Sequence, residues 1–211
     1  MRYFITVLIM MIPAVMIGQN PEIIELPEPD KTGGKPLMQA LNERQSQRDF
    51  SDKSLSDQQM SDMLWAAWGI NRENGKHTAP TSRNQQEMEV YVANSKGLFR
   101  YLPGEHALKL IHNHDIMAKT GKQDFVDDAA INLIFVANYN KVDDDVTATE
   151  YRETSGINAG YISQNVYLYC ASEGLATVVR GWFDRDEVHE AMQLEDFRDV
   201  ILCQTVGYPA E

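Results

Sequence analysis

The stretch EMEVYVANSKGLFRYLP, residues 87–103, decides the fold class of this chain. Apolar Met88, Val90 and Val92 recur at every second position, which is the spacing of a half-buried strand. The tetrapeptide NSKG at 94–97 has turn composition, and a second strand-like run follows it directly. The stretch therefore predicts a β-hairpin, so a sheet that contains it cannot be wholly parallel.

Helical and strand-like segments alternate on both sides of this hairpin. Before it we expect a helix that begins at Pro36 and ends near residues 42–45, and a second helix opened by Ser56 and Gln59 at capping-box spacing and stopped by Gly69. After it we expect a mixed helical region over about 105–130, a central strand at 131–139, a helix over about 149–172, a strand at 176–182, a helix at 184–194 and a strand at 199–209. This order predicts an α+β domain in which helices pack around a mainly antiparallel central sheet.

Length and charge narrow the class of ligand. A chain of 211 residues suits one sizeable core rather than two independent domains. Its formal net charge of -12 disfavours a surface for nucleic acid or for an anionic membrane. Any phosphate-bearing ligand therefore needs a local basic pocket.

The N-terminal segment has the layout of a secretory signal. Arg2 precedes an apolar run over residues 4–17, and Gly18 follows this run. The run is shorter than the roughly 20 apolar residues that a membrane span needs. We expect a signal peptide at 1–18, an extended tether rich in Pro, Gly and charge at 19–35, and a folded domain at 36–211 in an exported protein without stable membrane insertion. A membrane anchor and a cytoplasmic location are the alternatives.

The cysteines and histidines do not have metal-ligand spacing. Cys170 and Cys203 lie in helix-like and strand-like runs, which favours buried thiols over a disulfide. His112 and His114 are two apart and would point to different faces of a helix, which favours surface histidines.

The segment NERQSQRDF at 42–50 is the first candidate ligand site. Arg44 and Arg48 supply planar donor forks and Ser46 supplies a hydroxyl, a combination that suits a phosphate monoester. The alternative is a solvated helix end, where arginines meet the carbonyl end of the helix dipole.

Two other segments are candidate ligand sites as well. KHTAPTSRNQQ at 76–86 is either a hydrophilic connection or a loop that bonds the edge of a heterocycle, through Thr81, Ser82, Asn84 and Gln85. In VVRGWFD, Gly181 lets backbone approach a flat ligand, and the rings of Trp182 and Phe183 either stack on it or fill core.

Taken together, these segments resemble the nitroreductase superfamily of flavoproteins, and within it the branch of SagB-type (azoline) dehydrogenases. The resemblance rests on six segments in family order: LPEPDKTGGKPLMQALNERQSQRDF, LWAAWGINR, HTAPTSRNQQEMEVYV, GLFRYLPGEHAL, AGYISQNVYLYCASEGLATVVRGWFD and VGYP. They cover nearly the whole chain from Leu26 to Pro209.

The resemblance implies FMN bound between the subunits of an intertwined homodimer, with no catalytic side chain because the flavin carries the chemistry. The element that holds the FMN phosphate in the family matches Arg44, Gln45, Ser46 and Arg48. The element expected near the flavin from the partner subunit matches Pro80, Thr81, Ser82, Asn84 and Gln86. The strand-end glycine beside flavin N5 and O4 matches Gly181, with Val179 and Arg180 adjacent.

The chain departs from the family pattern in two places. Many relatives carry a basic residue after Gly-Tyr-Pro that completes the phosphate site, whereas here only Ala210 and Glu211 follow, which makes Arg83 or Arg180 the candidate substitute. The chain also lacks the Lys-Tyr pair of azoline dehydrogenases, which disfavours peptide azoline oxidation.

The activity that the resemblance implies is ping-pong hydride transfer to a small organic acceptor such as a nitro compound or quinone. The donor would be NAD(P)H or, in an exported protein, a membrane quinol or a partner protein. A non-catalytic flavin-binding protein on the same scaffold and a purely structural exported domain are the alternatives.

Overall fold

The fold is described from a computed structural model, which covers residues 22–143 and 148–210, without the side chains of 148 and 149. The predicted signal peptide at 1–18 lies outside these residues. Seven strands form one sheet in which every neighbouring pair is antiparallel. In spatial order they are β1 (Ile23–Glu25), β4 (Ala107–His112), β3 (Gly97–Leu102), β2 (Met88–Asn94), β5 (Ile131–Asn138), β7 (Arg198–Gly207) and β6 (Ala176–Arg180).

The predicted hairpin is confirmed as β2 and β3, with Asn94 opposite Gly97 at the turn. Gly97 has a φ of 139°, and a Cβ atom added to it would lie 2.3 Å from the carbonyl oxygen of His112. The turn therefore requires glycine for both its backbone conformation and its packing against β4.

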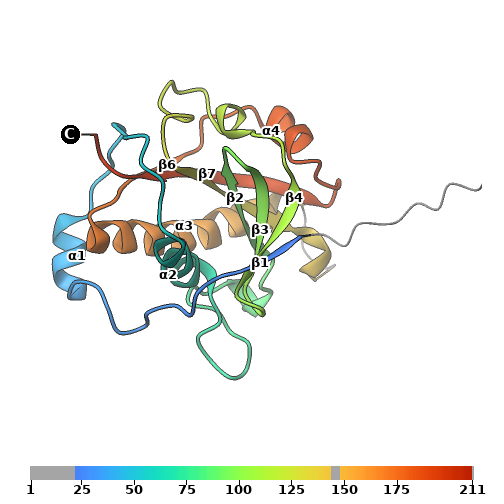
Figure 1. The fold of residues 1–211 in the computed structure, drawn as a ribbon. Coiled ribbons are helices and arrows are strands. Elements are labelled where there is room, and N and C mark those ends of the chain that lie inside the picture. The colour runs from blue at the N-terminus through green and yellow to red at the C-terminus, as the bar shows by residue number, and fades with distance from the viewer. Residues whose placement is uncertain (1–21, 144–147, 211) are drawn as a thin grey trace, which may run out of the picture.

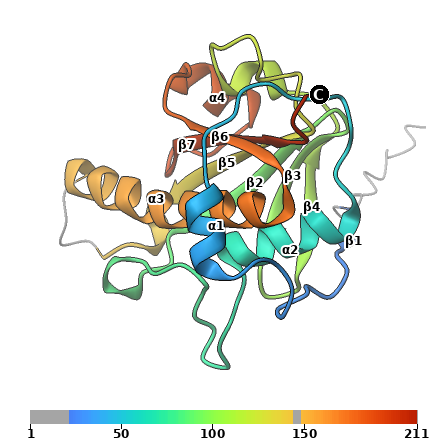
Figure 2. The ribbon, with the colours of Figure 1, turned by 90° about the vertical axis from the view of Figure 1, so that its left-hand side faces the viewer.

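Helices cover both faces of the sheet (Figures 1 and 2). One face carries α1 (Leu37–Glu43), α2 (Asp57–Trp68) and the long α3 (Ala148–Glu173), and the other carries α4 (Arg185–Ala191). The predicted capping box of α2 is present, since Gln59 N donates to Ser56 Oγ at 3.2 Å and Ser56 N donates to Gln59 Oε1 at 3.0 Å. The α+β class with a mainly antiparallel sheet is thus confirmed.

Two hydrophobic clusters hold these layers together. Strand β5 is buried along its whole length, with Leu133 and Phe135 in the cluster under α2 and α3, and Ile134 and Val136 in the cluster under α4. Successive side chains of a strand point to opposite faces, so β5 is the central layer of the molecule. Cys170 and Cys203 are buried free thiols in these clusters, as the sequence predicts.

The expectation of a helical region over 105–130 is wrong. Residues 107–112 form β4, which pairs with β3 on one side and with β1 on the other, and only a short 3₁₀ turn at Met117–Thr120 follows. Two ladders of backbone hydrogen bonds outweigh the local preference of these residues. The strand β1 also lies inside the segment expected as a tether.

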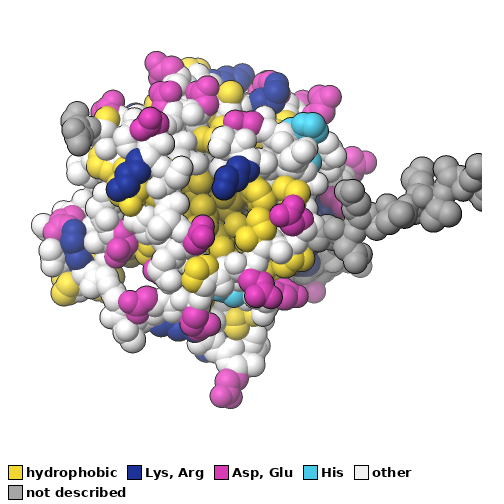
Figure 3. All heavy atoms as spheres, viewed as in Figure 1, with side chains coloured by type: hydrophobic (Ala, Val, Ile, Leu, Met, Phe, Trp, Pro, Cys, Tyr) yellow, Lys and Arg dark blue, Asp and Glu magenta, His cyan; other side chains and the backbone are white. Residues whose placement is uncertain are grey.

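Acidic side chains are spread over the surface. Figure 3 shows hydrophobic side chains gathered at the centre of one face, with Asp and Glu side chains around them and few Lys or Arg. No helix in the described part of the chain is long and apolar enough to cross a membrane.

Candidate functional site

The segment 44–50, called the arginine loop here, connects α1 to the residues before α2 and crosses one end of the sheet (Figure 2). Its backbone is anchored at two places. Gln47 N donates to Thr177 O at 3.0 Å, and Phe50 forms a β-bridge with Pro209. The loop is therefore attached to β6 and to the segment after β7, although it contains no helix or strand of its own.

Tyr167, a buried residue of α3, joins this loop to β6. Its Oη lies 2.8 Å from Ser46 Oγ and accepts a hydrogen bond from Val179 N at 3.0 Å. The guanidinium of Arg44 lies 5.3 Å from the centroid of the same ring. One side chain thus brings together three of the residues that the resemblance places at the flavin.

Tyr167 was missed in the sequence analysis. Helical spacing places it on the same side of α3 as Ser163 and Cys170, both of which are buried. A tyrosine on a buried helical face requires a partner for its hydroxyl, and this is the signal that points to it.

The two arginines of the loop have no ion-pair partner among the residues that the structure describes. Glu43, which directly precedes Arg44, is already paired with Lys35 at 2.6 Å. Arg44 is half-buried and Arg48 is exposed. In an acidic protein, two uncompensated guanidinium groups on one loop fit a dianion such as a phosphate monoester.

The backbone is open directly after β6. Gly181 is exposed, and a Cβ atom added to it would have only Leu202 Cδ2 near it, at 3.9 Å. The rings that follow have different environments, because Trp182 is 65% exposed whereas Phe183 is buried under α4. Phe183 is therefore core, and Trp182 is free to contact a ligand.

The guanidinium of Arg180 points into the interior. It donates to Thr120 O at 2.6 Å, to Asn132 Oδ1 at 2.7 Å and to Thr205 Oγ1 at 2.9 Å, and burial lowers its pKa. Arg180 thereby fixes the 3₁₀ turn before Gly121 against the end of β6. Its donors are used inside the fold, so they are not available to a phosphate group.

The loop at 80–86 has a strained backbone. Arg83, Asn84 and Gln86 have φ values of 51°, 57° and 52°, in the left-handed region that side chains other than glycine rarely adopt. Strain of this kind is common at ligand sites. Arg83, the other candidate for completing the phosphate site, lies 3.9 Å from Asp143.

This loop is docked on the N-terminal half of α3. Ser82 N donates to Asn158 Oδ1 at 3.3 Å, and Asn158 Nδ2 donates to Glu87 Oε1 at 2.8 Å. Glu87 is 2% exposed and also accepts from Ser155 Oγ at 3.1 Å, whereas its Oε2 atom has no partner. Glu87 is a supporting residue that the sequence analysis missed.

The two predicted segments do not meet within one chain. The arginine loop contacts α3 at Tyr167 and the loop at 80–86 contacts it at Asn158, about nine residues or 14 Å apart along the helix axis.

Two hollows flank the arginine loop. A groove of about 810 Å³ is lined by Arg48, Phe50, Lys122, Phe125 and Trp182, among others. A smaller hollow of about 450 Å³ lies on the side of Arg44 and Gln45. The groove has three aromatic side chains in its walls, reaches the residue after Gly181, and is also lined by the carboxylates of Asp49, Asp124 and Asp128.

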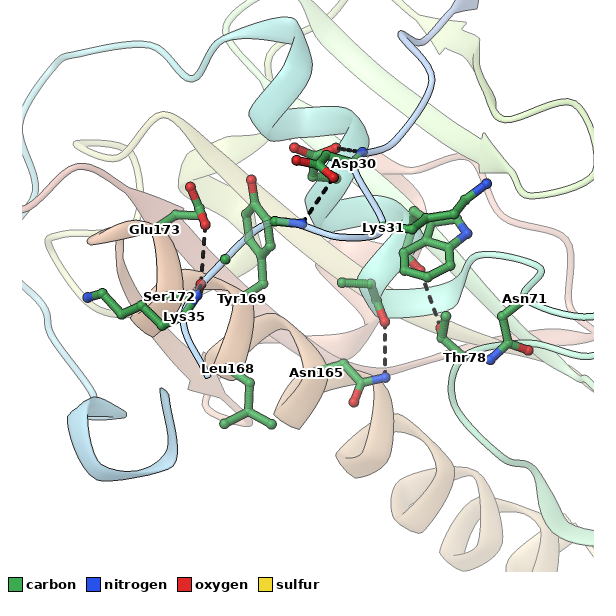
Figure 4. A pocket seen from close by; sticks show the side chains of 15 residues that line it. Asp30, Lys31, Lys35, Asn71, Thr78, Asn165, Leu168, Tyr169, Ser172 and Glu173 are labelled. Carbon is green, nitrogen blue, oxygen red and sulfur yellow. Dashed lines mark hydrogen bonds between the residues drawn. The ribbon is translucent and has the colours of Figure 1, made fainter. Parts of the chain in front are cut away.

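A different cavity of about 490 Å³ lies between residues 30–35, α2 and α3 (Figure 4). Its walls include Trp65, Asn165 and Tyr169, and the buried hydroxyl of Tyr169 has no hydrogen-bond partner. None of the predicted cofactor-binding residues lines this cavity.

Within the described residues, no group of three or more His, Cys, Asp or Glu side chains is arranged to hold a metal ion. His112 lies at the end of β4 rather than on a helix, and its Nε2 is 3.0 Å from Ala191 O.

Comparisons with known proteins agree on one family. The sequence model described as the nitroreductase family matches residues 41–208. A candidate nitroreductase from Methanocaldococcus jannaschii is 29% identical over 185 residues, which cover 83% of this chain and 92% of that protein.

Solved structures show the same fold. A candidate nitroreductase from Ralstonia eutropha JMP134 is 42% identical with a TM-score of 0.86, and the match covers 92% of this chain and 93% of that one. The NADPH:FMN oxidoreductase of Vibrio harveyi shares the fold at 21% identity with a TM-score of 0.62, over 83% of this chain and 69% of that one.

Proposed function

Since this chain belongs to the nitroreductase family, we propose that it is an FMN-dependent oxidoreductase that works as a homodimer. The observation that carries this proposal is the junction at Tyr167, which holds Arg44 and Ser46 next to the strand that ends at the open backbone of Gly181. When bound, FMN would supply ping-pong hydride transfer from a reduced donor to a small organic acceptor such as a nitro compound or quinone.

The arginine loop would bind the FMN phosphate. Arg44 and Arg48 are free to donate to phosphate oxygens, and charge-assisted hydrogen bonds contribute roughly 1.5 to 3 kcal/mol each. The ring of Tyr167 limits the orientations of Arg44, and its hydroxyl fixes Ser46. A preorganised loop loses less entropy when the ligand binds.

The flavin ring would lie against the open backbone at Gly181. A side chain at this position would stand between the strand end and a flat ligand, whereas glycine leaves the space free. The groove that contains Trp182 then leaves room beside the ring for the acceptor.

A second subunit would complete the site with its loop at 80–86. Two helices of this chain expose apolar side chains that a partner would cover: Leu37 (63%), Met38 (74%) and Leu41 (43%) on α1, and Ile157 (60%) and Tyr161 (48%) on α3. Exposed apolar patches of this kind mark interaction surfaces. Gly156 and Gly160 of α3 have open space where a Cβ atom would be, which permits close approach of another helix.

Within the family we propose the SagB-type branch, on the six segments that the sequence shares with it, and a substrate other than a peptide azoline, because the Lys-Tyr pair is lacking. We also propose export through the segment at 1–18. An exported enzyme would take electrons from a membrane quinol or a partner protein, since nicotinamide cofactors are found inside cells. Deletion of residues 2–18 would then abolish secretion, and unchanged secretion would contradict this proposal.

A non-catalytic flavin-binding protein is the second candidate function. The observation that favours it is that both candidates for completing the phosphate site are engaged elsewhere, since Arg180 donates into the interior and Arg83 lies 3.9 Å from Asp143. Steady turnover with any donor and acceptor would exclude it.

The experiment that tests the proposal is an absorbance spectrum of protein purified without added cofactor, repeated after heat release. We expect the bands of oxidised flavin, and FMN in the supernatant. A colourless protein that does not take up added FMN would show that the arginine loop is only a helix end. Oxidation of NADH, NADPH or a soluble quinol by the FMN-loaded protein then identifies the class of donor.

A further inference from the structure

A cavity of about 390 Å³ lies where four neighbouring strands of the sheet begin or end. The strands β3 and β5 end there, and β2 and β7 begin there. The cavity is at the start of β7, whereas the arginine loop contacts the segment after its end, about 30 Å away for a strand of ten residues. It is therefore separate from the proposed phosphate site.

Three cations and one carboxylate line this cavity. The carboxylate is Glu89, which is engaged on both oxygens. Its Oε2 accepts from Arg198 Nε at 2.8 Å and from Tyr91 Oη at 3.1 Å, and its Oε1 accepts from Asn138 Nδ2 at 2.9 Å. Arg198 is also paired with Glu195, outside the cavity. Glu89 and Arg198 thus neutralise each other.

The other two cations, Arg100 and Lys141, are not neutralised in this way. Arg100 Nη1 lies 4.0 Å and Lys141 Nζ lies 3.9 Å from Glu89 Oε1, beyond hydrogen-bond distance. Arg100 is also directly opposite Lys109 in the pairing of β3 with β4, and like charges in that position repel. The cavity therefore has an excess of positive charge in a protein whose net charge is -12.

Partial burial makes this excess of positive charge unfavourable. It lowers the pKa of Lys141, and the nearby charges of Arg100 and Arg198 lower it further, although Glu89 and Glu87 oppose the shift. Burial lowers the pKa of the adjacent His77, and the centroid of its ring lies 3.9 Å from that of the stacked Trp68 ring. Lys141 Nζ donates to Gln86 O at 3.2 Å, which leaves two of its three donors for a ligand. The cavity thus combines two cationic side chains with an aromatic wall.

We propose that this cavity binds a small oxyanion, a carboxylate or phosphate group of a small molecule, through Arg100 and Lys141. Such a group would accept from both side chains and reduce the repulsion among these cations. The inference rests on the charge and geometry of the cavity and does not depend on the proposed redox function.

The test is thermal unfolding of the purified protein, with excess FMN added, in sodium phosphate or sodium malonate, compared with sodium chloride at the same ionic strength. Excess FMN keeps phosphate away from the arginine loop. A ligand at ten times its Kd should raise the Tm by roughly 3 to 5 °C. Arg100→Gln and Lys141→Gln should each weaken the apparent affinity by about 10-fold or more. Lys96→Gln removes the same charge from the hairpin turn, outside the cavity, and should respond like the wild type.

Equal responses to all three salts would overturn the proposal, and so would a response that Arg100→Gln and Lys141→Gln retain in full. The charge-preserving Arg100→Lys variant should keep most of the affinity in calorimetric titrations with the same anions. If Arg100→Lys binds no better than Arg100→Gln although both are folded, the charge of Arg100 does not hold the anion.

Discussion

The arginine loop and the loop at 80–86 are the two halves expected at the flavin, and they are built differently. The arginine loop is completed within its own chain, because Tyr167 and β6 hold its residues in place. The loop at 80–86 is held in a strained conformation on α3, and Pro80, Ser82 and Asn84 are exposed. The first half is self-contained in its structure, whereas the second presents exposed side chains to the outside of the chain.

The largest expected effect is the loss of FMN affinity when the arginine loop, the self-contained half, is changed. Arg44→Ala together with Arg48→Ala removes two charge-assisted donors, which should weaken FMN binding by more than about 100-fold. FMN fluorescence titration measures this loss, with Lys96→Ala as a control for the change in charge. Stoichiometric FMN in the purified double variant would contradict the phosphate assignment.

The second prediction tests whether the loop at 80–86 of one subunit contributes to the FMN site of the other subunit. Ser82→Ala with Asn84→Gly removes two exposed side chains, and glycine suits the left-handed φ at residue 84. Dimers mixed from this variant and the Arg44→Ala, Arg48→Ala variant should recover about a quarter of the wild-type sites, because each hybrid dimer regenerates one intact site.

The mixing experiment has a clear negative outcome. If the two variants are purified separately, mixed after mild dissociation and still bind no more FMN than either alone, the two halves do not come from different subunits. The comparison between a self-contained half and a presented half would then fail.

The third prediction concerns the junction itself. Tyr167→Phe removes the hydroxyl that contacts Ser46 and Val179, and should weaken FMN binding by about 10-fold at a cost of roughly 1 kcal/mol of stability. Tyr169→Phe is the matched control, because it removes a hydroxyl of the same helix that has no hydrogen-bond partner among the described residues. Equal FMN affinities for the two variants would show that Tyr167 only packs.

The parts of the molecule that were predictable are those with local signals. The hairpin and the capping box of α2 depend on residues three to six positions apart, and both are confirmed. The pairing of β4 with β1 and the hydrogen bond between Tyr167 and Ser46, 121 positions apart, depend on distant residues that no local pattern reveals. The sequence analysis assigned Arg180 to the flavin site because it directly precedes Gly181. The hydrogen-bond acceptors of its guanidinium are in fact Thr120, Asn132 and Thr205.

The smallest expected effect is the loss of stability at acidic pH. It should begin near the loop at 80–86 rather than in the arginine loop. His77, just before the loop at 80–86, is buried, and this burial lowers its pKa below the ordinary value of 6.5. The unfolded chain therefore binds a proton on His77 at a higher pH than the folded chain does. The free energy of unfolding falls as the pH drops from about 6.5 towards the pKa of His77 in the folded protein, and this loss is absent at higher pH. The slope is at most about 1.4 kcal/mol per pH unit for one group.

Denaturant unfolding at pH 7.5 and pH 5.5 measures this loss, and His77→Asn is the matched variant, because its amide can donate to Trp68 O as His77 Nδ1 does. His106, whose pKa burial also lowers, remains in both proteins and cancels in the comparison. The variant should lose less stability than the wild type over this interval. Hydrogen exchange should accelerate at acidic pH in residues 76–86 before it does so in the arginine loop, because neither His77 nor His106 contacts that loop. Simultaneous acceleration in both segments would mean that acid acts on the whole fold rather than on the presented half.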